Sequence, residues 1–125
     1  MSPLFGTVWI YSGPDWVIKR FFDDMYDDGR FIEVVSYLSR RWGYVNDDVA
    51  CHFPDMNSYF EEEHFEGVQF ILCLPTPDPY EVIVSDEEFA VWLRMACDRY
   101  LAQHPSDVGE ISKSLAQLDE WSSRS

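Results

Sequence analysis

The stretch between Trp42 and Leu93 contains no lysine or arginine, although it holds twelve of the chain's 23 aspartate and glutamate residues. The whole chain has nine basic residues and a formal net charge of −14, so this one stretch carries most of the excess charge. Proteins that bind nucleic acid or an anionic membrane need a basic patch. The acidity therefore argues against both and favours a cationic partner, metal ions or solubility alone.

Sequence signatures of catalysis are also missing. The chain has no glycine-rich phosphate loop, no HExxH pair and no Ser-His-Asp spacing. Paired carboxylates such as Asp27-Asp28 are expected in solvent, whereas a general acid needs a carboxyl group in an apolar pocket. We therefore expect neither catalytic residues nor enzyme activity.

Cysteine usage and hydropathy indicate the cellular compartment in which the protein is expected. The three cysteines, at positions 51, 73 and 97, form no CxxC pair, and no secretory signal precedes them. An odd, dispersed set of this kind indicates reduced thiols in a cytosol, and all three thiols are expected in the core. No apolar run approaches the roughly 18 residues of a membrane helix. We therefore expect a cytoplasmic protein without a membrane span.

Aromatic residues, in contrast, are abundant. They make up 17% of the chain, and hydrophobic residues make up 46%, whereas disordered acidic segments are poor in aromatics. A chain of 125 residues is most simply one domain. We expect a single domain over residues 1–125, with residues 1–13 as an N-terminal strand or arm and residues 122–125 as a frayed tail.

Apolar spacing predicts two helices before the acidic stretch. The first runs from about residue 14 to Gly29, with the acids at positions 23, 24, 27 and 28 on a solvated face. The second runs from about Arg30 to Trp42, and Trp42 is expected on its apolar stripe. Gly43 is expected to end this helix.

Three strands and two further helices are predicted after Gly43. The strands are residues 49–53, 68–74 and 80–84, and the short link between the last two favours an antiparallel hairpin. Ser85 and Glu88 form a capping-box sequence that starts a helix. A last helix follows His104-Pro105, with Val108 on its apolar stripe. The fold class is therefore α+β: a small antiparallel β-sheet of about three strands packed with about four α-helices.

Cys51 and His52, with His64 twelve residues further on, raise the alternative of a metal-binding protein. Zinc sites prefer tighter ligand pairs than this one. Adjacent residues of a strand also point to opposite faces of the sheet, so one of the first two residues is expected in the core. We therefore expect no metal and no cofactor, and a metal-binding protein stays the third alternative.

The acidic residues of the stretch differ in how local structure explains them. Asp86, Glu87 and Glu88 fall in the first turn of a predicted helix, where carboxylates favour the helix dipole. The acids at positions 47–48 and 55–66 fall in loops, so no helix start explains them. They alternate with aromatics that look exposed, and aromatic anchors among charges are typical of a protein-binding surface. A solvated loop with some aromatics tucked under it is the alternative.

We therefore expect a partner protein to contact eight residues of these loops. They are Asp47, Asp48, Asp55, Tyr59, Glu61, Glu62, Glu63 and Glu66. The aromatic residues that alternate with them or flank them are Tyr44, Phe53, Tyr59, Phe60 and Phe65.

An ordered set of short segments resembles a known family. The segments are Phe31-Ile32-Glu33, Trp42-Gly43-Tyr44, Cys51-His52-Phe53-Pro54-Asp55, Phe65-Glu66-Gly67-Val68, Val82-Ile83-Val84-Ser85, Glu87-Glu88-Phe89, Ala96-Cys97-Asp98-Arg99-Tyr100 and His104-Pro105. Their order and spacing resemble the small acidic immunity proteins of contact-dependent growth inhibition systems (CdiI), in the group paired with ribonuclease toxins. The resemblance covers roughly residues 16–118 and excludes residues 1–13 and the loop at 75–79.

This resemblance implies a non-enzymatic inhibitor. Such a protein binds the C-terminal nuclease domain of a toxin delivered by a neighbouring cell. It acts stoichiometrically in the cytoplasm, as a 1:1 complex, by covering the RNA-binding or active-site cleft. No family residues are carried over as a binding site. An acidic mimic of nucleic acid that acts on another basic cytosolic protein is the alternative, because it shares the same electrostatics.

Overall fold

The computed structural model confirms the α+β class and describes residues 16–46, 48–54, 59, 67–72 and 80–122. The elements follow the order α1 (Trp16–Asp27), α2 (Phe31–Ser39), β1 (Tyr44–Val45), β2 (Val49–His52), β3 (Val68–Leu72), β4 (Tyr80–Val84), α3 (Asp86–Gln103), a short 3-10 helix η3 (Pro105–Asp107) and α4 (Val108–Ser122). Of the regions singled out in the sequence, residues 1–13, Cys73 and the loop at 75–79 lie outside the described part.

The sheet has four antiparallel strands in the order β1-β2-β3-β4, one more than the periodicity predicts. Cys51 of β2 pairs with Phe70 of β3, which pairs with Val82 of β4, so these three side chains share one face. The additional strand β1 has two residues, and Tyr44 pairs with Cys51. Two residues are too few to show the alternation by which a strand is recognised in a sequence.

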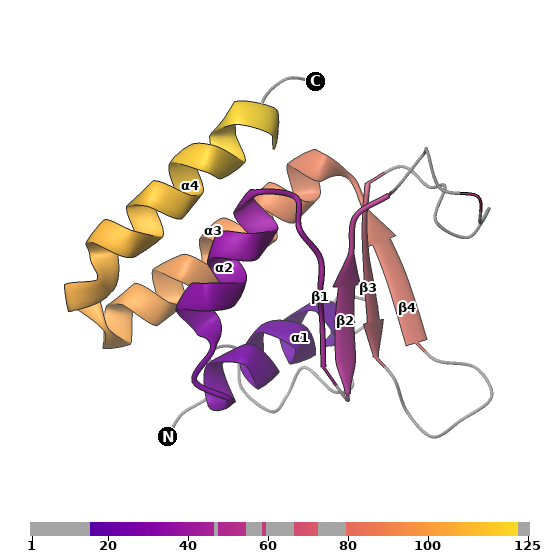
Figure 1. The fold of residues 1–125 in the computed structure, drawn as a ribbon. Helices are drawn as coiled ribbons and strands as arrows, with labels where there is room; N and C mark the ends of the chain where they lie inside the picture. The colour runs from indigo at the N-terminus through magenta and orange to yellow at the C-terminus, as the bar shows by residue number, and fades with distance from the viewer. Residues whose placement is uncertain (1–15, 47, 55–58, 60–66, 73–79, 123–125) are drawn as a thin grey trace.

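Figure 1 shows all four helices on one side of the sheet. Helix α1 packs against β2, β3 and β4, while α4 packs against α2 and α3. The core between α1, α3 and the sheet contains an aromatic cluster in which the ring of Phe70 lies 5.5 Å from Phe21 and 6.0 Å from Phe89. Cys51 and Cys97 are fully buried, as expected.

Helices α1 and α2 end in the same hydrogen-bond pattern, but with different residues at the critical position. At the end of α1, Gly29 N–H donates to Tyr26 O and Arg30 N–H to Met25 O, and Gly29 has φ of 73°. At the end of α2, Arg41 N–H donates to Leu38 O and Trp42 N–H to Tyr37 O, and Arg41 has φ of 62°. Glycine is the usual residue at this left-handed position because it has no Cβ.

The predicted end of the second helix is therefore wrong. Helix α2 stops at Ser39, and Arg41, not Gly43, takes the left-handed conformation. Gly43 has another reason to be glycine: a Cβ there would lie 2.7 Å from the carbonyl oxygen of Cys51 on the neighbouring strand. Trp42 leaves the helical stripe and is 54% exposed.

The start of α3 is as predicted, because the Ser85 hydroxyl accepts a hydrogen bond from Glu88 N–H at 3.0 Å. In α4, Ile111 and Leu118 are buried, but Val108 is 53% exposed, so its place on the buried stripe is wrong. Ser122 is the last residue of α4 and is buried; residues 123–125 lie outside the described part. Within the described ranges, no helix is both long and apolar enough to cross a membrane.

Candidate functional site

Of the eight predicted contact residues, the structure describes Asp48 and Tyr59. Both side chains are exposed, and that of Tyr59 is 93% exposed. The remaining six residues lie outside the described part of the chain, as do Phe60 and Phe65: Asp47, Asp55, Glu61, Glu62, Glu63 and Glu66. Their contact with a partner stays a prediction.

Asp48 lies in the turn that joins β1 to β2. The Asn46 side-chain oxygen accepts hydrogen bonds from Asp48 N–H and Val49 N–H, both at 2.8 Å. This is the local turn that asparagine side chains form with the backbone two or three residues on. Asp48 therefore precedes β2 and Phe53 follows it, so the two loops of the predicted site leave opposite ends of a four-residue strand, roughly 13 Å apart.

Phe53, at the far end of β2, is not an exposed aromatic as the sequence suggests. Its ring is partly buried and meets Phe89 and Trp121 edge-on, at centroid distances of 5.5 and 5.9 Å. The Arg41 guanidinium lies over Phe53 at 5.4 Å and over Trp121 at 4.7 Å, and its Nη1 is 3.1 Å from Asp86 Oδ2. We call Arg41, Phe53, Asp86 and Trp121 the Arg41 cluster. The cluster holds Phe53, the residue that directly follows β2, in place.

Tyr44 is also partly buried, because it packs on the hydrophobic core and lies parallel to Tyr37 at 6.3 Å. Trp42 stacks on the same Tyr37 ring at 6.0 Å, with the Arg40 guanidinium 5.1 Å from the Trp42 ring. A hydrogen bond that Tyr37 donates to Glu33 raises the pKa of the phenol, so Tyr37 stays neutral. The exposed indole of Trp42 is an aromatic surface that the sequence pattern placed in the core.

The structure brings Asp48 next to carboxylates of α1. The pKa of Asp24 is raised, first by burial and further by the negative charges of Asp48 and Asp28, against the opposing effect of Arg20. Asn46 Nδ2 donates to Asp28 Oδ2 at 3.5 Å, which links the same turn to the end of α1. We call Asp24, Asp28 and Asp48 the acidic cluster. The expected solvated face of α1 is confirmed for Asp27 and Asp28, which are exposed, and is wrong for Asp23, which is buried.

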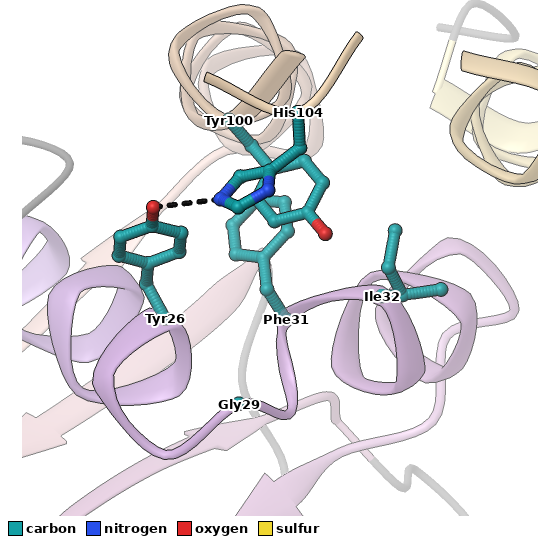
Figure 2. Close-up of a pocket in the computed structure, with 6 residues that line it drawn as sticks. All are labelled: Tyr26, Gly29, Phe31, Ile32, Tyr100 and His104. Carbon is teal, nitrogen blue, oxygen red and sulfur yellow. Dashed lines mark hydrogen bonds between the residues drawn. The ribbon is translucent and has the colours of Figure 1, made fainter. Parts of the chain in front are cut away.

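A pocket opens between the α1–α2 turn and the end of α3 (Figure 2). It has a volume of about 150 Å³ and is lined by Tyr26, Gly29, Phe31, Ile32, Tyr100 and His104. Tyr100 lies parallel to Phe31 and to His104, at 4.6 Å from each ring. Figure 2 shows Tyr26 on one side of this stack and Ile32 on the other. Gly29, which lines the pocket, follows Asp28 of the acidic cluster in the chain.

Hydrogen bonds hold the rings of this aromatic pocket in place. The Tyr26 hydroxyl donates to Gln103 Oε1 at 3.2 Å and is hydrogen-bonded to His104 Nε2 at 2.8 Å. The Tyr100 hydroxyl donates to Asp107 Oδ2 at 2.6 Å. Burial and this carboxylate raise the pKa of Tyr100 to about 12, so the phenol stays protonated. The pocket is therefore rigid and preformed.

Sequence reasoning missed the aromatic pocket, since its residues come from α1, α2, α3 and the turns that end two of these helices. One feature of the sequence could have indicated it: Tyr26, Phe31, Tyr100 and His104 are four aromatic rings that lie at or next to helix ends. Their common location depends on how α3 crosses the α1–α2 turn, which no local pattern reports.

The alternative metal site is tested in part. Cys51 is fully buried and His52 is half-buried on the other face of the sheet, as the alternation along a strand predicts. Burial raises the pKa of the Cys51 thiol well above its usual value, and it raises that of Cys97 to about 12. His64 lies outside the described residues. Among those described, no three His, Cys, Asp or Glu side chains gather to hold a metal.

Aromatic side chains and clustered carboxylates, on a small α+β body, are the composition of a protein-binding surface. Comparison with known proteins places the chain more closely. A family model described as CDI immunity protein matches residues 14–115, so the chain belongs to the CDI immunity protein family. No curated protein matches the sequence significantly.

A solved structure shows the same fold. It is an immunity protein, NMB0503, from Neisseria meningitidis MC58, and it superimposes with a TM-score of 0.69. The match covers 90% of this chain and 98% of the other, with 13% sequence identity. At this low identity the likeness concerns the fold and not the binding residues.

Proposed function

We propose that this immunity protein neutralises a cognate toxin whose nuclease domain is basic, a ribonuclease, by covering its RNA-binding or active-site cleft. The observation that carries the proposal is the net charge of −14, concentrated in a stretch without any lysine or arginine. A ribonuclease gathers phosphates with Lys and Arg side chains. Carboxylates presented to the same cleft reproduce the charge of the substrate.

Charge and aromatic residues have separate tasks in this proposal. Opposed fields accelerate association, toward about 10⁸–10⁹ M⁻¹s⁻¹ at low salt. Charge pairs that become buried lose hydration, which offsets much of their attraction. Aromatic anchors such as the exposed Tyr59 therefore supply much of the affinity, while the acidic loops set the rate.

The protein acts in the cytoplasm as a stoichiometric inhibitor, in a 1:1 complex and without catalysis. RNA cleavage by the toxin domain, titrated with this protein, is expected to reach zero at one equivalent, and the two chains are expected to co-purify. A stoichiometric excess that left the nuclease fully active would refute the proposal. The association rate should also fall steeply with added salt, and a flat dependence would remove electrostatic steering while leaving binding intact.

The other candidate is an acidic mimic that acts on a different basic protein of the same cytosol, and the same charge distribution supports it. A pull-down from native cytosol separates the two. Capture of the toxin domain alone supports immunity, whereas capture of a nucleic-acid-binding host protein, with no effect on the toxin, supports the mimic.

A further inference from the structure

The aromatic pocket has the size of a site for a single side chain. Its volume of about 150 Å³ is well below the roughly 300–1,000 Å³ of small-molecule sites. It is also preformed, because the stacked rings and the two tyrosine hydroxyl bonds hold its walls. A preformed pocket of this size suits one anchoring residue of a partner, since less ordering accompanies binding.

The surroundings of the pocket favour a cation. Asp28 precedes the lining residue Gly29 in the chain, while Arg30, which follows Gly29, is paired with Glu33. The Asp107 carboxylate accepts the hydrogen bond of the lining residue Tyr100. None of the described residues that line it is a lysine or arginine. Aromatic rings attract cations over their faces, and long basic side chains bury their aliphatic stems against apolar walls such as Ile32.

The Arg41 cluster shows which cation this chemistry holds within the same molecule. There a guanidinium lies over two aromatic rings and pairs with a carboxylate. The aromatic pocket presents aromatic rings, one of which is hydrogen-bonded to the Asp107 carboxylate, and contains no such guanidinium among the described residues. Guanidinium is planar and weakly hydrated, so it stacks on rings better than an ammonium group does.

We propose that the aromatic pocket receives one arginine side chain of the toxin. This inference rests on the proposed function, because it requires a basic toxin as the partner. It adds a defined contact on the α1–α2 turn and the end of α3. Affinity for the toxin then depends on pocket shape as well as on net charge.

A second pocket provides the control. It lies between α2 and α4, has a volume of about 200 Å³, and its lining includes Arg40, Lys113 and Gln117. Ile32 lines both pockets, whereas Gln117 lines the second one alone. Two basic side chains at the second pocket disfavour an arginine there. Ile32→Trp therefore obstructs the proposed site, and Gln117→Trp obstructs the second pocket with the same added bulk.

The test measures toxin binding and dissociation rates for both variants, after circular dichroism and thermal unfolding have shown that each is folded. Ile32→Trp is expected to weaken binding about 30-fold or more, mainly through faster dissociation, and Gln117→Trp to stay within about twofold. Asp28→Asn leaves the pocket open and keeps the fold, and it is expected to weaken binding by about two- to fivefold.

An arginine scan of the toxin domain identifies the occupant. One Arg→Met substitution in the toxin is expected to weaken binding to the unaltered immunity protein, but to have no further effect on Ile32→Trp. If a folded Ile32→Trp bound normally, or if no Arg→Met substitution in the toxin were coupled to Ile32→Trp, the pocket inference would be overturned while inhibition of the nuclease stood. If the unaltered protein did not bind the toxin at all, the proposed function would fall, and this inference with it.

Discussion

The Arg41 cluster and the aromatic pocket contain the same kinds of groups, but one is complete and the other is open. In the Arg41 cluster the guanidinium comes from the chain itself. It joins the end of α2 to Phe53 after β2, to Asp86 at the start of α3 and to Trp121 at the end of α4. In the aromatic pocket the rings of Tyr26, Phe31, Tyr100 and His104 line a space of about 150 Å³. The difference separates a structural contact from a surface that a partner can complete.

The backbone at the two places supports this distinction. Gly29, beside the pocket, adopts its positive φ without strain, and a Cβ there would meet nothing within 4 Å. Arg41 adopts a similar φ of 62°, which costs a non-glycine residue about 1 kcal/mol or more. An arginine is retained at this strained position because its side chain makes contacts that glycine cannot make.

The largest effect on stability is expected from Arg41→Ala. The substitution removes the contacts with Phe53 and Trp121 and the ion pair with Asp86, and it keeps the backbone strain. Since the ion pair is about one-third exposed, screening limits its share, and the total loss is about 1–3 kcal/mol. Arg41→Gly is the matched control and should lose about 1 kcal/mol less, because the strain disappears. Equal stability of Arg41→Ala and the unaltered protein in urea unfolding would show that the Arg41 cluster is not a structural contact.

Charge reversal compares the two regions in binding. Asp28→Lys with Asp48→Lys alters the acidic cluster, whereas Glu87→Lys with Glu88→Lys alters the exposed helix start next to the Arg41 cluster. The first pair is expected to lower the association rate about tenfold at low salt, and the second pair less. Stopped-flow association with the toxin domain measures both. Equal effects would show that total charge, and not its position, controls the encounter.

The smallest effect is expected from Asp24→Asn, on stability alone. Burial and the neighbouring Asp48 and Asp28 raise the pKa of Asp24, so its carboxylate is less favourable in the folded than in the unfolded protein. That cost is fully present above the raised folded pKa, declines as pH falls through it, and is absent below the unfolded pKa of about 3.8. Asp24→Asn should therefore be slightly stabilising at pH 7 and neutral at pH 3. The gain at pH 7 is reduced because the substitution also removes the ion pair with Arg20. A loss of stability at pH 7 in thermal unfolding would show that the Arg20 ion pair outweighs burial.

Sequence patterns predicted most of the fold, and the residues that they misplaced share a cause. The capping box at Ser85, the buried stripe of α3 and three of the four strands follow from local spacing. The predicted burial of Trp42 and of Phe53 is wrong. Trp42 was expected in the core and is exposed, whereas Phe53 was expected on the surface and packs on Trp121. Helix α2 ends at Ser39, earlier than predicted, and the Arg41 side chain that follows contacts Asp86 of α3 and Trp121 of α4. These contacts join residues far apart in the chain, so local sequence patterns do not reveal them.

The candidate site divides in the same way. The excess of carboxylates between Trp42 and Leu93 is visible without any structure, and it points to a basic partner. The placement of Asp48 near Asp24 and Asp28, and the assembly of the aromatic pocket from three helix ends, are not visible there. The contacts of the six predicted acids outside the described residues stay a prediction that charge reversal in the loop at 55–66 can test.

By itself, the sequence determined the charge distribution, the secondary structure and the family, because each depends on residue types and on spacings of a few residues. The tertiary structure alone decided which carboxylates share a surface, which aromatics are exposed, and which cluster already holds its cation. These properties depend on contacts between residues far apart in the chain, such as Phe31 with Tyr100 and Arg41 with Trp121. Burial and electrostatic attraction act through space, so the folded arrangement of the helix ends gives each aromatic cluster its role.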